Sequence, residues 1–386
     1  MNRRRFLRNG LGSAVSMTMA TTVPFSLLGS ARAVASEEYR AVVCVLLAGG
    51  ADSFNILVPR SELAYNRYQA RRSDLALSQN DLLPLDGEHE GVQFGLHPAM
   101  SSLQQRFNAG QATMVTNIGP LVEPTTRAAI DAETVTLPLG LFSHSDQILS
   151  WQTATPANRA GTGFGGRLID ALPGANTGLA LAGNISLSGN NSFQAGAATG
   201  SYAISANRGV QSITGFDNDL FKRSFESLMA DSSASTLQTV YGNKLQSAID
   251  AGDVFSSALS QATTFSTPFG EDSFSSAMKR IAELVSVHEQ LGVSRQTFFV
   301  TLGGWDHHED TLGHQATMLP ALDAGLGQFQ LALEELGLSN QVTTFTISDF
   351  GRTLTSNGRG SDHGWGGNTM VMGGAVQGGQ LYGHFP

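Results

Sequence analysis

The chain has 386 residues, of which only 14% are charged, well below the roughly 25% that is usual in soluble domains. Its formal net charge is −9, and because five of the 23 basic residues and none of the 32 acidic ones lie in positions 1–35, the remainder carries −14. A chain this acidic is a poor partner for nucleic acid or an anionic membrane surface, which excludes both classes of function. The single cysteine, Cys44, excludes an intramolecular disulfide and lies in an apolar run, as a small core residue does.

The first 35 residues have the three parts of an export signal. Arg3-Arg4-Arg5 precedes Phe6-Leu7, a weakly apolar run follows at about 11–28, and small residues at 31–35 offer cleavage sites. We predict cleavage after Ala35, and the arginine pair indicates the twin-arginine route, which carries folded proteins. The alternative is an uncleaved anchor, but the run is short for a membrane span and rich in Gly, Ser and Thr.

Export of this kind implies a location and a transient partner. The translocase of the twin-arginine pathway is the expected partner during export, and the mature protein is expected in the periplasm or outside the cell. Since no other apolar run is long enough to span a bilayer, no stable membrane span is expected after cleavage.

The rest of the chain alternates strands with helices. An apolar run at 40–48, β-branched at its start and ended by Gly49-Gly50, predicts a buried strand of a parallel sheet. In chain order the pattern then predicts a helix at 97–107, a strand at 112–118, a helix at 143–152, a helix at 277–291, a strand at 296–302, a helix at 316–336, and strands at 342–347 and 369–372. This alternation is typical of an α/β fold with a mainly parallel sheet.

The alternation breaks down between about 172 and 267. That stretch is rich in Ser, Ala, Gly and Asn, and it contains only two helical patterns, at 218–229 and 234–249. We interpret it as an insertion or cap on the sheet of a domain that spans 36–386.

Aspartates follow three of the predicted strands. Asp52 comes after the strand at 40–48, Asp306 after the strand at 296–302 and Asp349 after the strand at 342–347, and a further glycine-rich turn holds Asp362-His363. Ligands of open α/β sheets bind at the carboxyl ends of the strands, and the glycines allow sharp turns there. A single aspartate in a glycine-rich turn after a strand does not indicate a function. The four turns together, however, indicate a binding site at this edge of the sheet.

Carboxylates that are brought together repel one another unless a cation lies between them. Histidines are interspersed with them, and a mixture of Asp and His suits Zn²⁺, Mn²⁺ or a similar ion better than Ca²⁺. A centre of one or two divalent metal ions is therefore expected. His314 follows Asp310 by one helical turn, where it is either a ligand or a helix-capping residue.

Ser143 stands at the predicted start of a helix, with Asp146 three residues later. It is either an ordinary N-cap or a nucleophile at the positive end of a helix dipole, where a developing negative charge is stabilised.

Several segments together resemble the DUF1501 proteins, an exported family of unknown function that is distantly similar to the alkaline phosphatase and sulfatase superfamily. The segments are LLAGGADSFNILVP (46–59), LHPAM (96–100), SHSDQILSWQT (143–153), GFGGRL (163–168), GGWDHH (303–308), SDFGR (348–352), SDHGWGG (361–367) and GGQLYGHFP (378–386). The resemblance implies an alkaline-phosphatase-like α/β fold with helices on both faces of the sheet. Family members usually continue past the last segment, so the end at Pro386 is expected to be a truncation.

The resemblance also implies roles for individual residues. Ser143 corresponds to the superfamily nucleophile, although His144 or Ser145 could take that place, and Arg352 could contact the anionic ester through its planar fork. Phe350 stands where the superfamily has a second metal-binding histidine, which favours one ion or a degenerate site. The implied metal ligands are Asp52, Asp306, His308 (less favoured, His307 or His314), Asp349 and His363.

The function that we expect is therefore an exported, metal-dependent hydrolase whose substrate is a small phosphate or sulfate ester. The alternative is a non-catalytic exported protein that keeps the fold and a degenerate metal site. A third hypothesis is a surface module that binds glycans or a protein through the stretch at 172–267.

Overall fold

The computed structural model describes residues 38–386, except for 160, 179, 212–217 and 230–234. The predicted export signal at 1–35 lies outside the described residues. Within them, no helix combines the length and the apolar character needed to cross a membrane.

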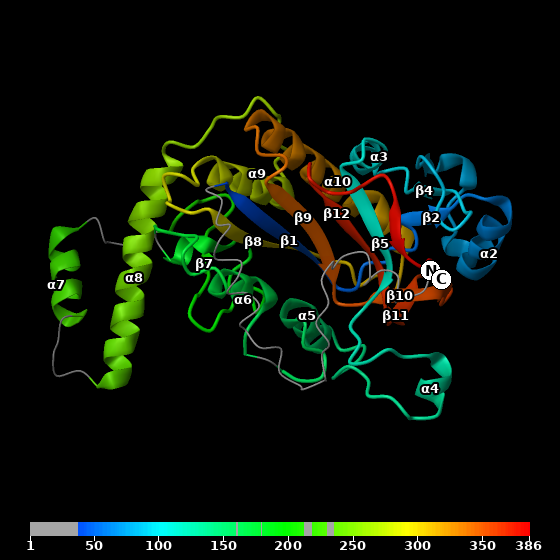
Figure 1. The fold of residues 1–386 in the computed structure, drawn as a ribbon, viewed down its shortest axis with the longest axis horizontal. Helices are drawn as coiled ribbons and strands as arrows, with labels where there is room; N and C mark the ends of the chain where they lie inside the picture. Colours follow the sequence, from blue (N-terminus) through cyan, green and yellow to red (C-terminus); the bar gives the residue numbers. More distant parts are fainter. Residues whose placement is uncertain (1–37, 160, 179, 212–217, 230–234) are drawn as a thin grey trace, which may run out of the picture. The chain divides into compact units, whose positions relative to one another are not determined.

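A central eight-stranded sheet dominates the fold, with the strand order β13-β5-β12-β9-β1-β8-β6-β7 (Figure 1). Only β12 runs antiparallel to its neighbours, and the other pairings are parallel. The strands of this sheet are β1 (Arg40–Ala48), β5 (Ala112–Ile118), β6 (Asn184–Ser186), β7 (Tyr202–Ala203), β8 (Arg295–Gly303), β9 (Val342–Ser348), β12 (Gly367–Met372) and β13 (Leu381–Gly383). The prediction of a mainly parallel α/β sheet is confirmed.

Helices cover both faces of this sheet. In Figure 1, α3, α9 and α10 lie on one face, and α5 and α6 lie on the other. The α-helices are α2 (Glu62–Arg72), α3 (Ser101–Asn108), α4 (Arg127–Asp131), α5 (His144–Thr153), α6 (Phe164–Asp170), α7 (Asp219–Met229), α8 (Thr236–Leu259), α9 (Ser273–Ser286) and α10 (Thr311–Glu335). Three short 3₁₀ helices are η3 (Ser73–Leu75), η4 (Gln79–Asp81) and η5 (Ala180–Gly183).

Two small sheets flank the main one. A three-stranded sheet contains β2 (Leu57–Pro59), β3 (Leu83–Pro84) and β4 (Phe94–Leu96). A hairpin is formed by β10 (Gly351–Ser356) and β11 (Ser361–Gly364), which pair antiparallel. The hairpin brings the second half of the SDFGR segment beside the SDHGWGG segment.

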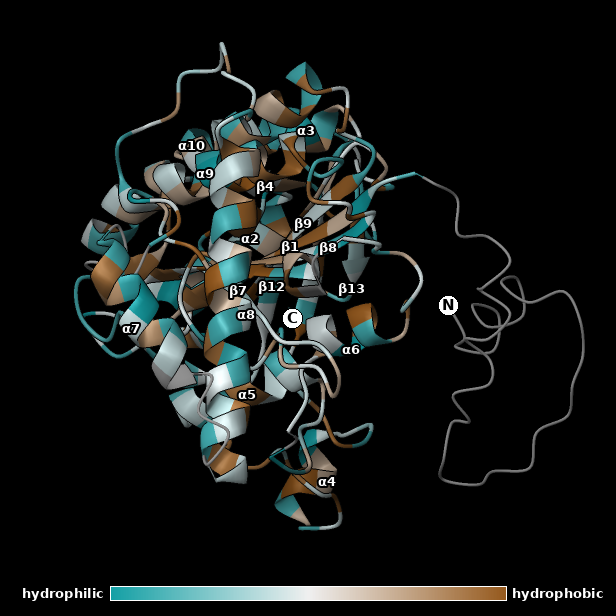
Figure 2. Ribbon diagram, turned by 90° about the vertical axis from the view of Figure 1, so that its left-hand side faces the viewer, coloured by the Kyte–Doolittle hydropathy of each residue, from teal (hydrophilic) through white to brown (hydrophobic). Residues whose placement is uncertain are grey.

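The strand β1 lies in the middle of the sheet, between β8 and β9. Its apolar side chains are buried on both faces, which explains why its sequence shows no alternation. Cys44 is fully buried there, as the sequence predicts for a core residue. Figure 2 shows the hydrophobic colours gathered on these central strands and on the parts of the helices that face them.

Most predicted elements are confirmed, with shifts at their ends. The strands predicted at 40–48 and 112–118 have these bounds in the structure. The helix predicted at 97–107 begins only at Ser101, because a residue that precedes proline, here His97 before Pro98, disfavours the helical conformation. The helix predicted from Ala277 begins earlier, at Ser273, because the Asp272 carboxylate accepts hydrogen bonds from two amides of its first turn.

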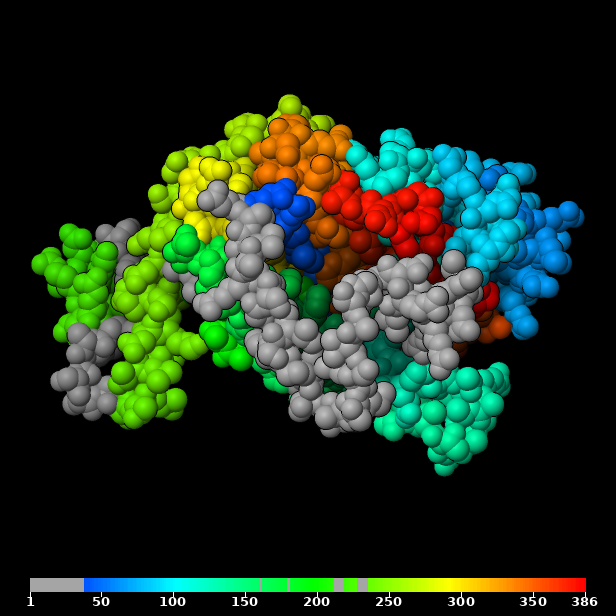
Figure 3. Space-filling model, viewed as in Figure 1, coloured from blue at the N-terminus to red at the C-terminus, as the bar shows by residue number. Residues whose placement is uncertain are grey.

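The stretch at 172–267 is more closely tied to the sheet than an insertion would be. Its strands β6 and β7 extend the main sheet beyond β8. The C-terminal half of α8 is anchored by Phe255, which is fully buried. The N-terminal half of α8 and the helix α7 form a lobe at one end of the view in Figure 3, with Leu237 and Tyr241 exposed.

The core between the sheet and its helices yields a stability prediction. Phe298 on β8 is fully buried, so Phe298→Ala is expected to lower the free energy of unfolding by about 3–5 kcal/mol, because it leaves a cavity. The matched control Leu63→Ala, at a side chain that is 67% exposed, is expected to change it by less than about 0.5 kcal/mol. Urea denaturation measures both, and similar losses in the two variants would contradict this placement of the core.

Candidate metal centre

The loops that follow three parallel strands meet at one edge of the main sheet. In the register of the sheet Ala48 lies beside Gly303 and Leu47 lies beside Ser348, so β1, β8 and β9 end together. The loops after β8 and β9 therefore bring Asp306 and Asp349 to the same edge. The first residue of α5, His144, and His363 of the hairpin reach this edge from other parts of the chain.

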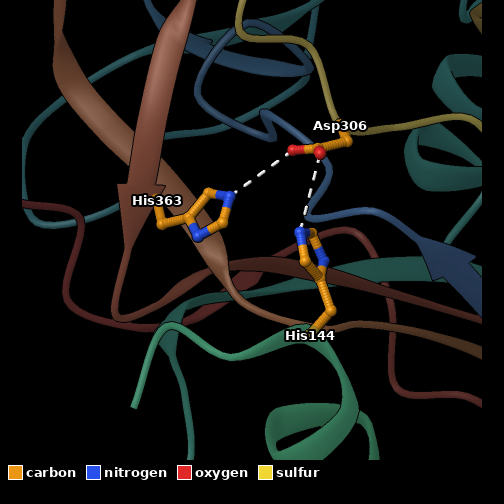
Figure 4. A group of neighbouring side chains, drawn as sticks. All are labelled: His144, Asp306 and His363. Carbon is orange, nitrogen blue, oxygen red and sulfur yellow. Dashed lines mark ion pairs between the residues drawn. The ribbon is translucent and has the colours of Figure 1, made fainter.

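At this edge His144, Asp306 and His363 offer ligand atoms that all lie within 4.8 Å of one another. Figure 4 shows both imidazole rings directed toward the Asp306 carboxylate. The Nε2 atom of His144 lies 3.6 Å from Oδ2 of Asp306, and Nε2 of His363 lies 3.4 Å from Oδ1. These separations are longer than those of ordinary hydrogen bonds, and the three groups face a common point.

A third imidazole, that of His308, belongs to the same group. Its Nε2 atom lies 3.1 Å from Oδ1 of Asp306 and 3.0 Å from Nε2 of His363. The neighbouring His307 points elsewhere: its side chain is buried and stacks on His314, with ring centroids 4.8 Å apart. Burial lowers the pKa of His307 to about 4, so it stays neutral inside the protein. The structure therefore brings His308 to the cluster and places His307 and His314 together outside it.

Each of the three cluster histidines is held through its other ring nitrogen. Nδ1 of His144 lies 2.7 Å from Oδ2 of Asp349, and Nδ1 of His308 lies 3.2 Å from Oδ1 of Asp362. Nδ1 of His363 lies 3.0 Å from the carbonyl oxygen of Phe142. Carboxylates and carbonyls accept hydrogen bonds, so Nδ1 of His144 and Nδ1 of His363 are donors. His308 has a carboxylate oxygen beside each of its ring nitrogens, that of Asp362 at Nδ1 and that of Asp306 at Nε2.

This tautomer leaves a lone pair on Nε2 of His144 and of His363, and the Nε2 atoms of all three histidines face Asp306. The Nε2 atoms of His308 and His363 lie 3.0 Å apart, so either a proton or a bound cation lies between them. Histidines that bind metal ions are held by carboxylates or carbonyls on their other nitrogen in the same way. Three imidazoles and one carboxylate thus fit a divalent ion that prefers nitrogen and oxygen ligands.

The charges and hydrogen bonds of the site lower the pKa of two of its carboxylates, those of Asp306 and Asp362. Partial burial tends to raise the pKa of Asp306, but the hydrogen bond and charge of Arg352, with His308 and His144, outweigh it and lower the pKa. Hydrogen bonds from Asn357 and His308 lower the pKa of Asp362. Partial burial lowers the pKa of His363, which favours the neutral imidazole that a metal ion requires.

Arg352, which the resemblance implied as a contact to the ester, is buried in the structure. Its side chain is 0% exposed, and its donors are engaged inside the protein. Nη2 donates to Oδ1 of Asp306 at 2.5 Å. The other acceptors are the carbonyl oxygens of Gly49, Gly50, Trp305 and Ser361. Arg352 therefore fixes the loops and Asp306 and has no face toward a substrate.

Two of the expected metal ligands, Asp52 and Asp349, lie outside the group of His144, Asp306 and His363. Asp52 is fully buried and pairs with Nη2 of Arg72 at 2.6 Å, while Ser361 Oγ donates to the same carboxylate oxygen. Asp349 is 1% exposed and engages both oxygens, one with the amide of Gly49 and the other with His144. Asp52 is thus held by Arg72 and Ser361, and Asp349 holds the ring of His144.

Ser143 lies beside the cluster as the residue before His144. It is the N-cap of α5, as predicted, but its side chain makes no capping hydrogen bond, and its Oγ lies 3.3 Å from Oγ of Ser145. Asp146 accepts hydrogen bonds from Arg159. The residue before Ser143, Phe142, has a φ of +69°, which is rare for a bulky side chain and is found mostly at constrained functional positions.

Phe350 fills the place where a second metal-binding histidine was expected. Its ring centroid lies 4.1 Å from that of His363 and 4.8 Å from that of His144. The aromatic ring supports the two imidazoles on one side, where it offers no ligand atom. This packing favours a centre with one ion.

The sequence missed three contributors to this centre. His144 was named only as an alternative nucleophile, whereas its ring is a candidate ligand. Asp362 was noted as part of a turn, and its spacing from His308 gave no sign of their contact. The carbonyl of Phe142 is a backbone group and leaves no trace in the sequence.

Three histidines and an aspartate lie together beyond the ends of the strands of a mainly parallel α/β sheet. The fold and this cluster place the chain in the class of candidate metal-binding α/β proteins. Within that class, this chain belongs to the DUF1501 family of proteins of unknown function, whose profile matches residues 39–386. No curated protein has a sequence that matches this chain.

The chain is similar to solved structures that include a sulfatase and an alkaline phosphatase. The match to the crystal structure of Ps i-CgsB has a TM-score of 0.35 at 11% identity and covers 90% of this chain and 69% of that one. The PsFucS1 sulfatase from Pseudoalteromonas sp. gives 0.34 at 12% identity, with 93% and 67% covered. A mutant of the alkaline phosphatase PafA gives 0.32 at 11%, with 82% and 63% covered. Similarities this remote carry no argument about activity.

The internal position of Arg352 yields a prediction. Arg352→Lys is expected to lower the free energy of unfolding by about 2–4 kcal/mol, because an ammonium group cannot reach the acceptors that the guanidinium bridges. The control Arg127→Lys, at a side chain that is 94% exposed, is expected to change it by less than about 0.5 kcal/mol. Chemical denaturation compares them, and equal stability of the two variants would show that Arg352 is not a structural hub.

Proposed function

We propose that this protein is an exported, metal-dependent hydrolase of phosphate or sulfate esters that uses one divalent ion. His144, His308, His363 and Asp306 would hold the ion. The observation that supports this most is the convergence of the three Nε2 atoms on the Asp306 carboxylate, at distances of 3.1 to 3.6 Å. Zn²⁺ and Mn²⁺ suit this donor set, and when bound such an ion supplies Lewis acidity for ester cleavage.

In this proposal Ser143 is the attacking group. Its hydroxyl is not used to cap α5, and it precedes the ligand His144 directly, so it lies at the positive end of the helix dipole. Attack by its oxygen would form a bond to the phosphorus or sulfur atom and break the ester bond, and the alcohol would leave with the serine proton. Water would then cleave the phosphate or sulfate ester of Ser143 and restore the hydroxyl. Asp349, Asp362 and the Phe142 carbonyl would keep the three imidazoles in the tautomer that binds the ion.

Export completes the proposal. Residues 1–35 would direct the folded protein through the twin-arginine translocase to the periplasm or the outside of the cell. Folding before export would allow the ion to be bound in the cytoplasm, where the supply of metals is controlled.

Metal analysis tests the centre. Purified protein is expected to contain about one divalent ion per chain, and His144→Ala and His363→Ala are expected to lose it, because each removes one ligand without touching Arg352. Asp349→Asn should fold and bind the ion about 10- to 100-fold more weakly, since it orients His144 without binding the ion. Asp131→Asn, at an exposed position of α4, is the control. Elemental analysis of a well-folded wild type that contains no metal would end the proposal.

Turnover tests the assignment of the nucleophile. Ser143→Ala is expected to lower the hydrolysis of phosphate or sulfate monoesters by about 10³-fold or more while metal content stays unchanged. Ser145→Ala serves as the matched control, because it removes a neighbouring hydroxyl from the same helix turn. Turnover that survives in Ser143→Ala but not in Ser145→Ala would move the nucleophile by two residues, and survival in both would reject a serine nucleophile.

A further inference from the structure

The strands β9 and β12 separate on the side of the metal centre. They pair antiparallel, and the last pair toward the carboxyl end of β9 is Phe345 with Val371, although β9 continues to Ser348. Next to this pair, the amide of Met370 donates to a side-chain oxygen, Oγ1 of Thr346, at 3.0 Å. The histidine cluster lies at the same edge of the sheet, so the separation opens the sheet beside the candidate site.

A cavity occupies the space between the separated strands. It measures about 360 Å³, part of which is open to solvent, and residues 346–348 of β9 and 367–369 of β12 form two of its walls. Its largest side chains are apolar and come from the strands and turns around it and from α5: Leu47, Ile56, Ile118, Trp151, Ile347 and Phe350. A concave, mainly apolar space with few polar groups is the usual form of a small-molecule site.

Phe350 joins the cavity to the metal centre. It lines the cavity, and its ring centroid lies 4.8 Å from that of His144 and 4.1 Å from that of His363. Helix α5 makes a second connection, because Trp151 follows His144 by seven residues and hence lies on the same face, about 10 Å further along the helix. The cavity is therefore within reach of a small ester whose anionic group lies at the proposed ion.

Trp151, a residue of the cavity wall, has an unpaired hydrogen-bond donor. Its Nε1 atom is shielded from solvent but has no hydrogen-bond partner among the described residues. Other polar groups of the wall are engaged within the protein: Oγ of Ser348 donates to the carbonyl oxygen of Leu47, and Oγ of Ser53 accepts from the amide of Asn368. Since buried donors are nearly always paired, the indole leaves a place for a ligand or a water molecule.

We infer that this cavity binds the alcohol part of the substrate and that this alcohol is aromatic, as in a phenyl ester. The rings of Trp151 and Phe350 favour an aromatic ring through offset or edge-to-face contacts, and burial against the apolar walls stabilises it. A sugar would bring several hydroxyl groups into this space at a cost in desolvation, since the hydroxyls of Ser53 and Ser348 already bond within the protein. The inference rests on the proposed function, because it names the class of ester that the centre would cleave.

Binding of uncleavable analogues tests the inference without mixing in the reactivity of the leaving group. Benzylphosphonate and ethylphosphonate carry the same anionic group and differ in ending in a phenyl ring or a methyl group. Each is titrated into the metal-loaded wild type, with the heat of binding as readout. Benzylphosphonate is expected to bind at least about 10-fold more tightly, because its ring buries apolar surface in the cavity. This comparison requires no variant.

A variant that fills the cavity locates the ring. Thr369→Phe adds a ring to the cavity wall and is expected to reduce the preference for benzylphosphonate to about twofold or less, while ethylphosphonate binds as it does to wild type. Val371→Phe is the matched control, because Val371 lies two residues along β12 on the same face but does not line the cavity. It is expected to keep the full preference. Metal content and circular dichroism show whether both variants fold.

The outcomes separate the inference from the proposed function. If the wild type hydrolyses phosphate or sulfate esters but binds the two phosphonates within about twofold of each other, the aromatic site is rejected while the hydrolase survives. Equal loss of the preference in Val371→Phe and Thr369→Phe would show that the ring does not bind in this cavity. If the metal-loaded wild type binds neither phosphonate and cleaves neither phenyl phosphate nor phenyl sulfate, both proposals fail together.

Discussion

The candidate site depends on the guanidinium of Arg352. Its nitrogens join the turn after β1, the loop after β8 and the start of β11, through the carbonyl oxygens of Gly50, Trp305 and Ser361 among others. The same group donates to Asp306, the carboxylate on which the histidines converge. Three loops from distant parts of the sequence are thus held by one side chain, which is pre-organised for several acceptors because its donors lie in one rigid plane.

The approach of these loops explains the glycines that follow β1. Gly49 has a φ of +122°, and a Cβ atom there would lie 2.5 Å from the amide nitrogen of Asp306. Gly50 has a φ of +83°, and its Cβ atom would lie 2.4 Å from the ring of Phe350. Only glycine allows both the backbone conformation and the close contact. The sequence therefore records the geometry of the site in its turns as well as in its ionisable residues.

The sequence was sufficient for the strands and the edge of the sheet but not for the roles of individual carboxylates. Continuous apolar runs such as 40–48 identify buried strands, whereas β6 and β7 are only three and two residues long and carry no recognisable pattern. An aspartate after a strand looks the same whether it binds a metal ion or a protein group. Asp52 faces Arg72 and Asp349 faces His144, and neither partner can be inferred from spacing, because each contact joins distant segments of the chain.

The side chains of the site form two layers with different roles. Their arrangement favours one ion over two in the proposed centre. An inner layer of Nε2 atoms and Asp306 faces the common point, and an outer layer of Asp349, Asp362 and the Phe142 carbonyl orients the rings. A second ion would need ligands of its own, but Asp349 is already committed to His144 and Gly49. Phe350 presents an aromatic ring to two of the histidines. A single ion cannot clamp both the attacking and the leaving oxygen as a pair of ions does, so the positive end of α5 would have to stabilise part of the charge of the transition state.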